Sequence, residues 1–230
     1  MDTTGSEASI VAPPSALVQG LDSRPILPRD FYRRPTVQVA KAILGQFLVH
    51  GERVGRIVEV EAYLGEEDRA AHAWHGRTAR TEVLYGPPGH AYVYLIYGMY
   101  ECLNIVAEPP GSPGCVLIRA LEPLAGIERM RAARPNAKSD HALCAGPGKL
   151  TRAMGISRGH YGADFTAGSL TIRRAPVAAR SVEIGVSGRI GIKHGADRLL
   201  RFFLAGNPCV SSHPGRPRPS LGSRALEVLF

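Results

Sequence analysis

The sequence predicts a single domain of the α+β class. Residues 54–63 alternate apolar and polar side chains with a period of two, which is typical of a strand. Residues 91–105 contain two apolar runs on either side of Gly98, which indicates a β-hairpin. Residues 35–44 instead repeat apolar side chains at helical spacing. The chain of 230 residues shows no internal repeat and no clean domain boundary, so we expect these elements to share one core.

The expected elements follow one another as short helices and strands. Residues 1–25 are rich in Ser, Ala, Pro and Gly, which predicts a flexible leader before a domain at 26–206. Asp30 can cap a first helix, and the helix at 35–44 is expected to end at Gly45. After these we expect paired strands at 46–50 and 54–63, a short helix at 66–75, the hairpin at 91–105, a strand at 115–121, helices at 126–134 and after Gly146, and strands at 169–174, 182–186 and 199–204.

Residues 207–230 are expected to form a flexible tail. Pro, Ser, Gly and Arg dominate this segment as far as Arg224. Residues 226–230, LEVLF, match the start of a viral-protease cleavage site used in expression vectors. We therefore interpret them as a vector remnant and leave them out of the fold prediction.

The charge distribution favours a polyanionic partner. The formal net charge is +8 and the isoelectric point about 9.6. Residues 129–205 carry 14 Lys and Arg against 4 Asp and Glu. A generally basic, solvated surface is the alternative explanation. The sequence has no signal peptide, no apolar run of membrane-spanning length and no C-x-x-C pair, so we expect a cytoplasmic protein with reduced thiols.

Glu61 is the first candidate for a catalytic residue. The period of two places it on the same strand face as Glu59 and Tyr63. A carboxylate in an apolar strand needs a partner or a function, because burying it unpaired costs free energy. The structural alternative is an ion pair with Arg56 or Arg119. Glu59 could be a second carboxylate in the reaction, or only a solvated neighbour.

Four tyrosines, at positions 92, 94, 97 and 100, form the second candidate site. Clustered strand tyrosines commonly pack against each other across a sheet. The alternative is a pocket in which aromatic faces stack on a nucleobase. The basic half of the chain and Glu61 favour that pocket. The predicted hairpin tip, residues 97–100, carries large apolar side chains where polar turn residues are usual, which suggests a wedge.

Two further motifs were considered as binding sites. His72 and His75 supply two ligands of the three or four that zinc requires, and no cysteine pair follows, so no metal or other cofactor is expected. The glycine-rich turn that opens a helix within residues 146–155 leaves backbone N–H groups unpaired, and Gly148 and Lys149 could contact a phosphate there. An ordinary helix start would have the same sequence.

Taken together, the motifs resemble the alkyladenine DNA glycosylase family, the 3-methyladenine excision enzymes that lack a helix-hairpin-helix. They span residues 28–205 in family order, and so many ordered matches are specific. The matching segments are RIVEVEAYLG at 56–65, D-x-x-A-H at 68–72, YVYLIYGMY at 92–100, C-x-N-I at 102–105, VLIRALEP at 116–123 and GPGKL at 146–150.

The resemblance implies a fold, a reaction and a set of site residues. The implied fold is one mixed domain around a curved antiparallel sheet with a protruding hairpin, and the implied reaction uses no metal. The implied substrate is double-stranded DNA with an alkylated or deaminated purine, which a monomeric enzyme would excise to leave an abasic site. By this resemblance Glu61 activates water, Arg119 holds Glu61 and the water, Tyr63, His72 and Tyr94 contact the flipped base, Asn104 contacts the base edge, and Tyr97 fills the gap in the duplex.

Three positions depart from the family pattern, and two other functions remain open. Thr81 and Glu82 stand where the family has other residues, and Glu101 replaces an aromatic residue or His. No lysine stands at the positions matched to the catalytic pocket, which predicts a monofunctional hydrolase. A non-catalytic nucleic-acid-binding module is the main alternative, although such a module would have no use for Glu61. A formyltransferase-type enzyme with a related sheet has no motif support.

Overall fold

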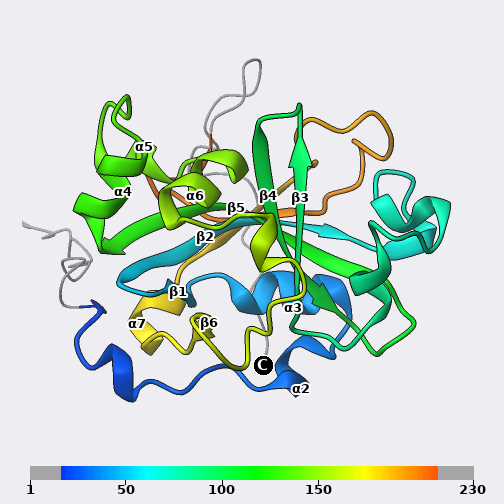
Figure 1. Ribbon diagram of the computed structural model, residues 1–230, viewed down its shortest axis with the longest axis horizontal. Helices are drawn as coiled ribbons and strands as arrows, with labels where there is room; N and C mark the ends of the chain where they lie inside the picture. The colour runs from blue at the N-terminus through cyan, green and yellow to red at the C-terminus, as the bar shows by residue number, and fades with distance from the viewer. Residues whose placement is uncertain (1–16, 212–230) are drawn as a thin grey trace, which may run out of the picture.

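An open antiparallel sheet of eight strands forms the centre of the molecule. The computed structural model describes residues 17–211 (Figure 1). The sheet order is β3-β4-β5-β2-β1-β6, and β8 joins β2 and carries β7. The strands are β1 Phe47–His50, β2 Arg53–Tyr63, β3 Ala91–Ile96, β4 Tyr100–Ala107, β5 Gly114–Ala125, β6 Leu170–Arg173, β7 Ile184–Ser187 and β8 Arg201–Leu204. The predicted α+β class is confirmed.

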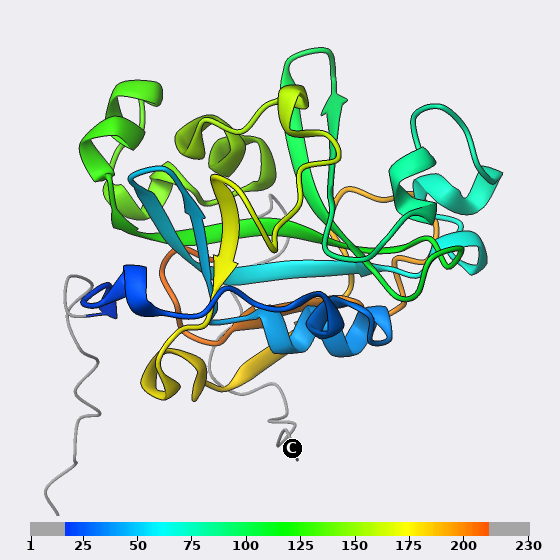
Figure 2. The ribbon, with the colours of Figure 1, turned by 60° about the horizontal axis from the view of Figure 1, so that its bottom comes forward.

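Helices cover both faces of the sheet (Figure 2). The helix α3 packs on β2 and β5 from one face, while α6 packs on β4 and β5 from the other, next to α4 and α5. This arrangement explains why β2 and β5 are buried along almost their whole length. The helices are α2 Arg29–Tyr32, α3 Thr36–Ile43, α4 Ile127–Ala133, α5 Asp140–Leu143, α6 Pro147–Met154 and α7 Val177–Arg180, and single turns of 3-10 helix lie at Leu21–Ser23, Gly65–Glu67, His72–His75, Glu82–Tyr85 and Arg158–His160.

The strand β2 changes neighbours in the middle. Along one edge, β1 pairs with residues 53–56 and β8 with residues 59–61, while β5 runs along the other edge. The register against β5 shifts on both sides of Glu59, which marks a β-bulge. Bulges commonly re-aim a side chain beside an active site. The exchange therefore places Glu59 and Glu61 between two antiparallel partners.

The hairpin β3–β4 protrudes from the sheet, as predicted. Residues 104–107 of β4 pair with β5, whereas residues 100–103 pair with β3 alone. In Figure 1 the outer half of the hairpin rises beside α6. Its tip closes through a hydrogen bond of 3.2 Å from the Met99 N–H to the Ile96 carbonyl, and Tyr97 and Gly98 both have positive φ. Positive φ at both central positions is what a type I′ hairpin turn requires.

Several predicted boundaries differ from the structure. The predicted helix at 66–75 is two separate 3-10 turns, because Ala71 and Asp68 adopt extended backbone between them. The predicted strand at 115–121 extends to Ala125, and α5 begins at Asp140, in a stretch for which no element was predicted. These differences arise where long-range packing decides the local conformation.

The packed part of the chain also extends beyond the predicted domain limits of 26 and 206. Leu17 is buried in a small core cluster with Phe47 and Val49. At the other end Val210 is buried, and Ser211 donates a hydrogen bond to Glu59. The predicted vector remnant at 226–230 lies outside the described residues. Within residues 17–211 none of the helices has both the length and the apolarity needed to cross a membrane.

Candidate active site

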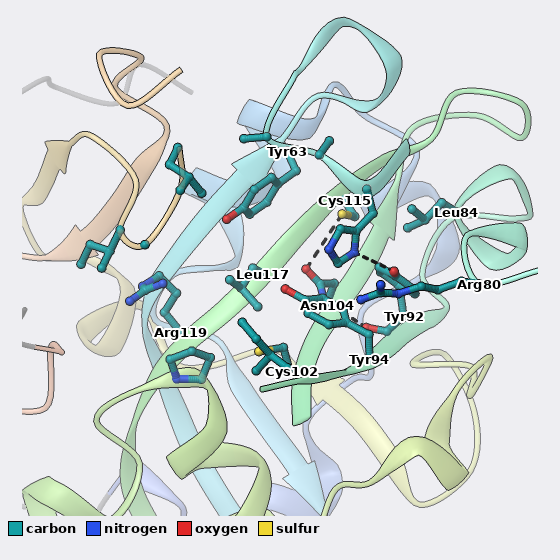
Figure 3. Close-up of a pocket in the computed structure, with 18 of the residues that line it drawn as sticks. Tyr63, Arg80, Leu84, Tyr92, Tyr94, Cys102, Asn104, Cys115, Leu117 and Arg119 are labelled. Atoms are coloured by element: carbon teal, nitrogen blue, oxygen red, sulfur yellow. Dashed lines mark hydrogen bonds between the residues drawn. The ribbon is translucent and has the colours of Figure 1, made fainter. Parts of the chain in front are cut away.

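A cavity of about 510 Å³ opens between the hairpin and the end of β2. Figure 3 shows Tyr63 on one side of it and Tyr92 and Tyr94 on the other, with Leu117 between them. Arg119 and segment 190–194 complete the wall. Tyr63, His72, Tyr94, Tyr97, Asn104 and Arg119, all predicted from sequence, line this one cavity. Its size and mixed lining are those of a pocket for a small flat ligand.

Glu61 lies directly behind the cavity wall and has no exposed surface. The Ile190 N–H donates to its Oε1 at 2.7 Å, and the Tyr63 hydroxyl donates to its Oε2 at 2.9 Å. The Arg119 Nη1 lies 3.3 Å from Oε1. All three partners line the cavity, so the carboxylate is held at its edge by groups that face into it. With three donors around it, the buried carboxylate is held in one orientation.

Glu59 is buried and accepts hydrogen bonds from three residues in different parts of the chain. Its Oε1 accepts hydrogen bonds from Arg119 at 2.9 Å, Arg201 at 2.7 Å and the Ser211 hydroxyl at 2.8 Å, and its Oε2 accepts one from the Ser211 N–H at 2.6 Å. Burial by itself raises the pKa of Glu59, but the charges of Arg119 and Arg201 and these hydrogen bonds bring it below its usual value. With both oxygens occupied, Glu59 is not available to water.

Of the two predicted structural partners of Glu61, the structure provides only Arg119. Arg56 pairs with Glu122, with its Nε 2.6 Å from the carboxylate. Arg119 joins both glutamates, and their negative charges raise its pKa although burial lowers it. The ion pair and the catalytic role predicted for Glu61 are therefore compatible, because Arg119 orients the carboxylate that would act on water.

The aromatic walls are fixed by hydrogen bonds at their rims. Burial, and after it the charge of Glu61, raises the pKa of Tyr63 far above its usual value, so this phenol stays protonated and donates to Glu61. The His72 ring packs edge-on against Tyr94, with ring centroids 4.5 Å apart, and its Nδ1 lies 2.8 Å from the Tyr92 hydroxyl. Burial and the positive charge of Arg80 lower the pKa of His72 to about 4, so its imidazole is neutral at pH 7.

Asn104 is buried in the wall between the tyrosines (Figure 3). Its Nδ2 donates to the Tyr92 carbonyl at 3.1 Å, and its Oδ1 accepts from the Cys115 thiol at 3.9 Å. Both ends of the amide are engaged, so its orientation is fixed. A rigid polar group in a cavity wall can discriminate between ligands that differ at one edge.

The hairpin tip combines high exposure with an unusual backbone. Tyr97 is 79% exposed and Met99 69% exposed. Tyr97 has φ of 53°, which side chains other than Gly, Asn and Asp rarely adopt. An exposed aromatic residue held in an unfavourable conformation is a candidate for a functional contact.

The residues predicted to contact phosphate lie outside the main cavity. Gly148 and Lys149 line a second cavity of about 390 Å³ at the start of α6, together with Tyr100 and Arg152. Lys149 and Arg152 are exposed, which gives this cavity a positive rim. The phosphate contact stays a prediction.

The sequence did not reveal several residues of the site. Arg189 is fully buried, donates to the Ala62 carbonyl at 3.1 Å and to both oxygens of Asp68, and lies 4.6 Å from the centroid of the Tyr63 ring. The exposed Lys193 also lines the cavity, at a position outside the motifs that carry the resemblance. Arg189 and Lys193 are among the 14 basic residues counted in 129–205, but no local sequence motif marks either of them as a site residue.

The acidic departures from the family pattern are neutralised within the protein. Arg77 donates to Glu82, with the Nε at 2.7 Å. The Arg158 guanidinium lies 3.7 Å from the Glu101 carboxylate, which also accepts from the Arg158 backbone N–H at 2.8 Å. Thr81 is buried and accepts from the Thr78 N–H at 2.9 Å. Each substitution therefore has a local structural partner.

His72 and His75 do not belong to a metal site in the part of the chain that the structure describes. Among residues 17–211 no group of three His, Cys, Asp or Glu side chains is placed to hold an ion. The Nδ1 of His72 is already engaged by Tyr92.

The sequence of the chain matches a known protein family over most of its length. A family model described as methylpurine-DNA glycosylase matches residues 30–208. The chain belongs to the methylpurine-DNA glycosylase family. The resemblance stated from the sequence is thus confirmed, and members of this family are DNA repair enzymes that hydrolyse N-glycosyl bonds.

Individual relatives agree with the methylpurine-DNA glycosylase assignment over nearly their whole length. A protein of Methanocella arvoryzae is 50% identical over 200 residues, covering 83% of this chain and 98% of the relative. Relatives from Chlorobaculum tepidum and Bacillus cereus are 45% and 46% identical, covering 86% and 80% of this chain and 96% and 98% of the relatives. All three are provisionally named 3-methyladenine DNA glycosylases.

Proposed function

We propose that this methylpurine-DNA glycosylase flips an alkylated or deaminated purine out of double-stranded DNA and hydrolyses its N-glycosidic bond with water activated by Glu61. The observation that carries the proposal is the placement of Glu61. A fully buried carboxylate is fixed by Tyr63, Arg119 and Ile190 at the edge of an aromatic cavity. A module that only binds DNA would gain nothing from a buried negative charge there.

The hairpin tip provides the means of opening the duplex. A base inside a helix is out of reach, so enzymes that act on it extrude it into a pocket. Tyr97 is exposed on the tip and also lines the cavity, so it can occupy the vacated position while the base enters. The extruded base would lie between Tyr63 and Tyr94, next to His72. The excess of Lys and Arg in residues 129–205 supports binding to the phosphates.

The chemistry of the cavity suits a cationic leaving group. Aromatic faces attract cations, and an alkylated purine such as 3-methyladenine is positively charged and leaves without protonation. Glu61 would take the proton from water as the water attacks the sugar C1′, and its charge would stabilise the oxocarbenium-like transition state. Deaminated purines are neutral and need protonation. Because the pKa of His72 is about 4, its ring is a poor proton donor at pH 7.

Duplexes with one defined lesion test this proposal directly. The expected result is release of the free base, with an abasic site in the strand, both with and without a chelator. Binding without base release would instead support the non-catalytic module, and strong inhibition by the chelator would support a metal reaction. Borohydride should trap no covalent complex, because we propose a monofunctional enzyme. A trapped complex would point to Lys193, which lines the cavity.

Replacing Tyr97 with Ala should weaken binding to a lesion in duplex DNA. The stacking that fills the gap is worth roughly 1–3 kcal/mol. The same lesion in a single strand should be affected much less, because no stack has to be filled. Val177→Ala is the control, because it also removes an exposed apolar side chain, on α7 far from the hairpin in Figure 1. An equal loss on both substrates would show that Tyr97 is not a wedge.

Replacing Asn104 with Ser should raise excision of guanine-type bases relative to hypoxanthine. Guanine has an exocyclic 2-amino group that the fixed amide of Asn104 would exclude. The shorter side chain opens space for that group. The ratio of guanine to hypoxanthine release measures the effect, and thermal melting reports on the fold. A proportional loss of both activities, or only a lower melting temperature, would leave Asn104 as a structural residue.

A further inference from the structure

We propose that the buried pair Arg189–Asp68 is a positioning device for the catalytic carboxylate. It would act by fixing two of the three groups that hold Glu61. The inference rests on the proposed role of Glu61 as the base. Neither residue lines the cavity, so both would act through Tyr63 and Ile190.

Asp68 is anchored to the backbone that follows β2. Its Oδ2 accepts from the Leu64 N–H and its Oδ1 from the Ala70 N–H, both at 3.2 Å. Burial by itself raises the pKa of Asp68, but the hydrogen bonds and charge of Arg189 and these N–H groups hold it below its usual value. Asp68 therefore presents a fixed negative charge just beyond the end of the catalytic strand.

Arg189 joins that charge to the opposite wall of the cavity. One nitrogen donates to the Asp68 Oδ1 at 2.8 Å, and another donates to the Asp68 Oδ2 and, at 3.1 Å, to the Ala62 carbonyl. The guanidinium also lies 4.6 Å from the centroid of Tyr63. Since Tyr63 lines the cavity and Arg189 does not, the cation packs behind the ring. The planar guanidinium of Arg189 has little freedom to move, because it donates to both oxygens of the Asp68 carboxylate.

Ile190 follows Arg189 directly and donates to Glu61. Among the described residues, the hydrogen bonds that join segment 189–194 to the body of the domain come from Arg189 and Ile190. The position of the Ile190 N–H therefore depends on the Arg189 anchor. Tyr63 donates to the Glu61 Oε2 and Ile190 to the Glu61 Oε1. Arg189 contacts the first of these residues and precedes the second, so it influences both oxygens of the carboxylate.

Stability alone is a weak reason for this pair. Desolvating two charges offsets most of their attraction, and apolar residues of similar size commonly stabilise a protein as well. The Arg189 Nε is moreover buried without a partner in the described structure. The buried Arg189–Asp68 pair is therefore better explained by the positions in which it holds Tyr63 and Ile190.

The test compares Arg189→Met, Arg189→Lys and Asp68→Asn with Arg56→Met. Arg56 is also buried and forms an ion pair, with the partly buried Glu122, but its partners do not include Glu61 or the residues that hold Glu61. We expect the single-turnover rate of base release to fall about 10- to 100-fold in Arg189→Met and Asp68→Asn, because small misplacements of a catalytic group have effects of this size. Dissociation constants for lesion DNA should change less than about threefold, because neither residue lines the cavity.

Two further comparisons make the result decisive. Arg189→Lys keeps the charge but loses the fork, so it should restore only part of the rate. The double variant Arg189→Met/Asp68→Asn should be no slower than either single variant, because the residues act as one unit. If Arg189→Met does not fold, Arg189→Lys and Asp68→Asn carry the test, with melting curves as the check.

Contrary outcomes overturn the proposal. Wild-type rates in the folded variants, or an equal loss of rate in Arg56→Met, would show that the pair is only structural. A loss in DNA affinity without a loss in rate would place it in binding. Failure of the base assignment is recognised separately, since Glu61→Gln would then retain activity whatever the Arg189 variants do.

Discussion

Replacing Glu61 with Gln is expected to slow base release by about 100- to 10,000-fold, the range for loss of a general base. Gln keeps the size of the side chain, and its oxygen can still accept from the Ile190 N–H. Arg119 stays paired with Glu59, so no buried charge is left alone. The variant should therefore fold and should still bind lesion-containing DNA. The measurement is the single-turnover rate beside the dissociation constant.

A matched control is available on the surface. Glu52→Gln makes the same change in an exposed ion pair with Arg129 and should leave excision unchanged. Base release near the wild-type rate in Glu61→Gln would remove Glu61 from the mechanism. A parallel loss of DNA binding would assign it instead to substrate recognition.

Replacing Glu59 with Gln is expected to act mainly on stability. Arg119 and Arg201 would lose the full charge that both now share, in a region without solvent. Breaking a buried ion pair by removing one partner costs about 3–5 kcal/mol. In a domain of this size the melting temperature should then fall by roughly 6–20 °C. Per folded molecule, excision should fall much less than in Glu61→Gln.

The Glu52→Gln control serves here as well. Its ion pair is exposed, so the melting temperature should stay within about 2 °C of the wild type. Denaturant unfolding and excision measured on the same samples separate the two effects. An unchanged melting temperature together with a rate as low as that of Glu61→Gln would restore Glu59 as a second catalytic carboxylate.

Local patterns in the sequence were sufficient for much of the fold. The period of two in 54–63, the apolar runs around Gly98 and the helical spacing in 35–44 correspond to β2, the hairpin and α3. These elements form where the local preference agrees with the burial that the fold imposes. The segment 66–75 was predicted incorrectly as a helix, because the buried Asp68–Arg189 pair fixes its backbone from far along the chain.

The site was also predictable only in part, because some of its residues come from distant parts of the chain. Glu61, Tyr63, Tyr94 and Asn104 stand in motifs that a single sequence shows, and the structure places them around one cavity edge. Arg189 and its neighbour Ile190 come from a loop about 130 residues away, and no periodicity links them to β2. The change of neighbours along β2 at Glu59 likewise involves β8, which pairs with β2 across a long separation in sequence.

The late position of these partners in the chain has a consequence for synthesis on the ribosome. The strand β2 is made early, but Arg189, Arg201 and Ser211 leave the ribosome more than 120 residues later. Until then Glu59 lacks its hydrogen bonds from Arg201 and Ser211, and Glu61 lacks the one from the Ile190 N–H, although Arg119 and Tyr63 are already present. The strand pair β2–β8 cannot close before residue 204 is available. The complete set of hydrogen-bond donors around Glu59 and Glu61 therefore forms only when translation of the domain is almost finished.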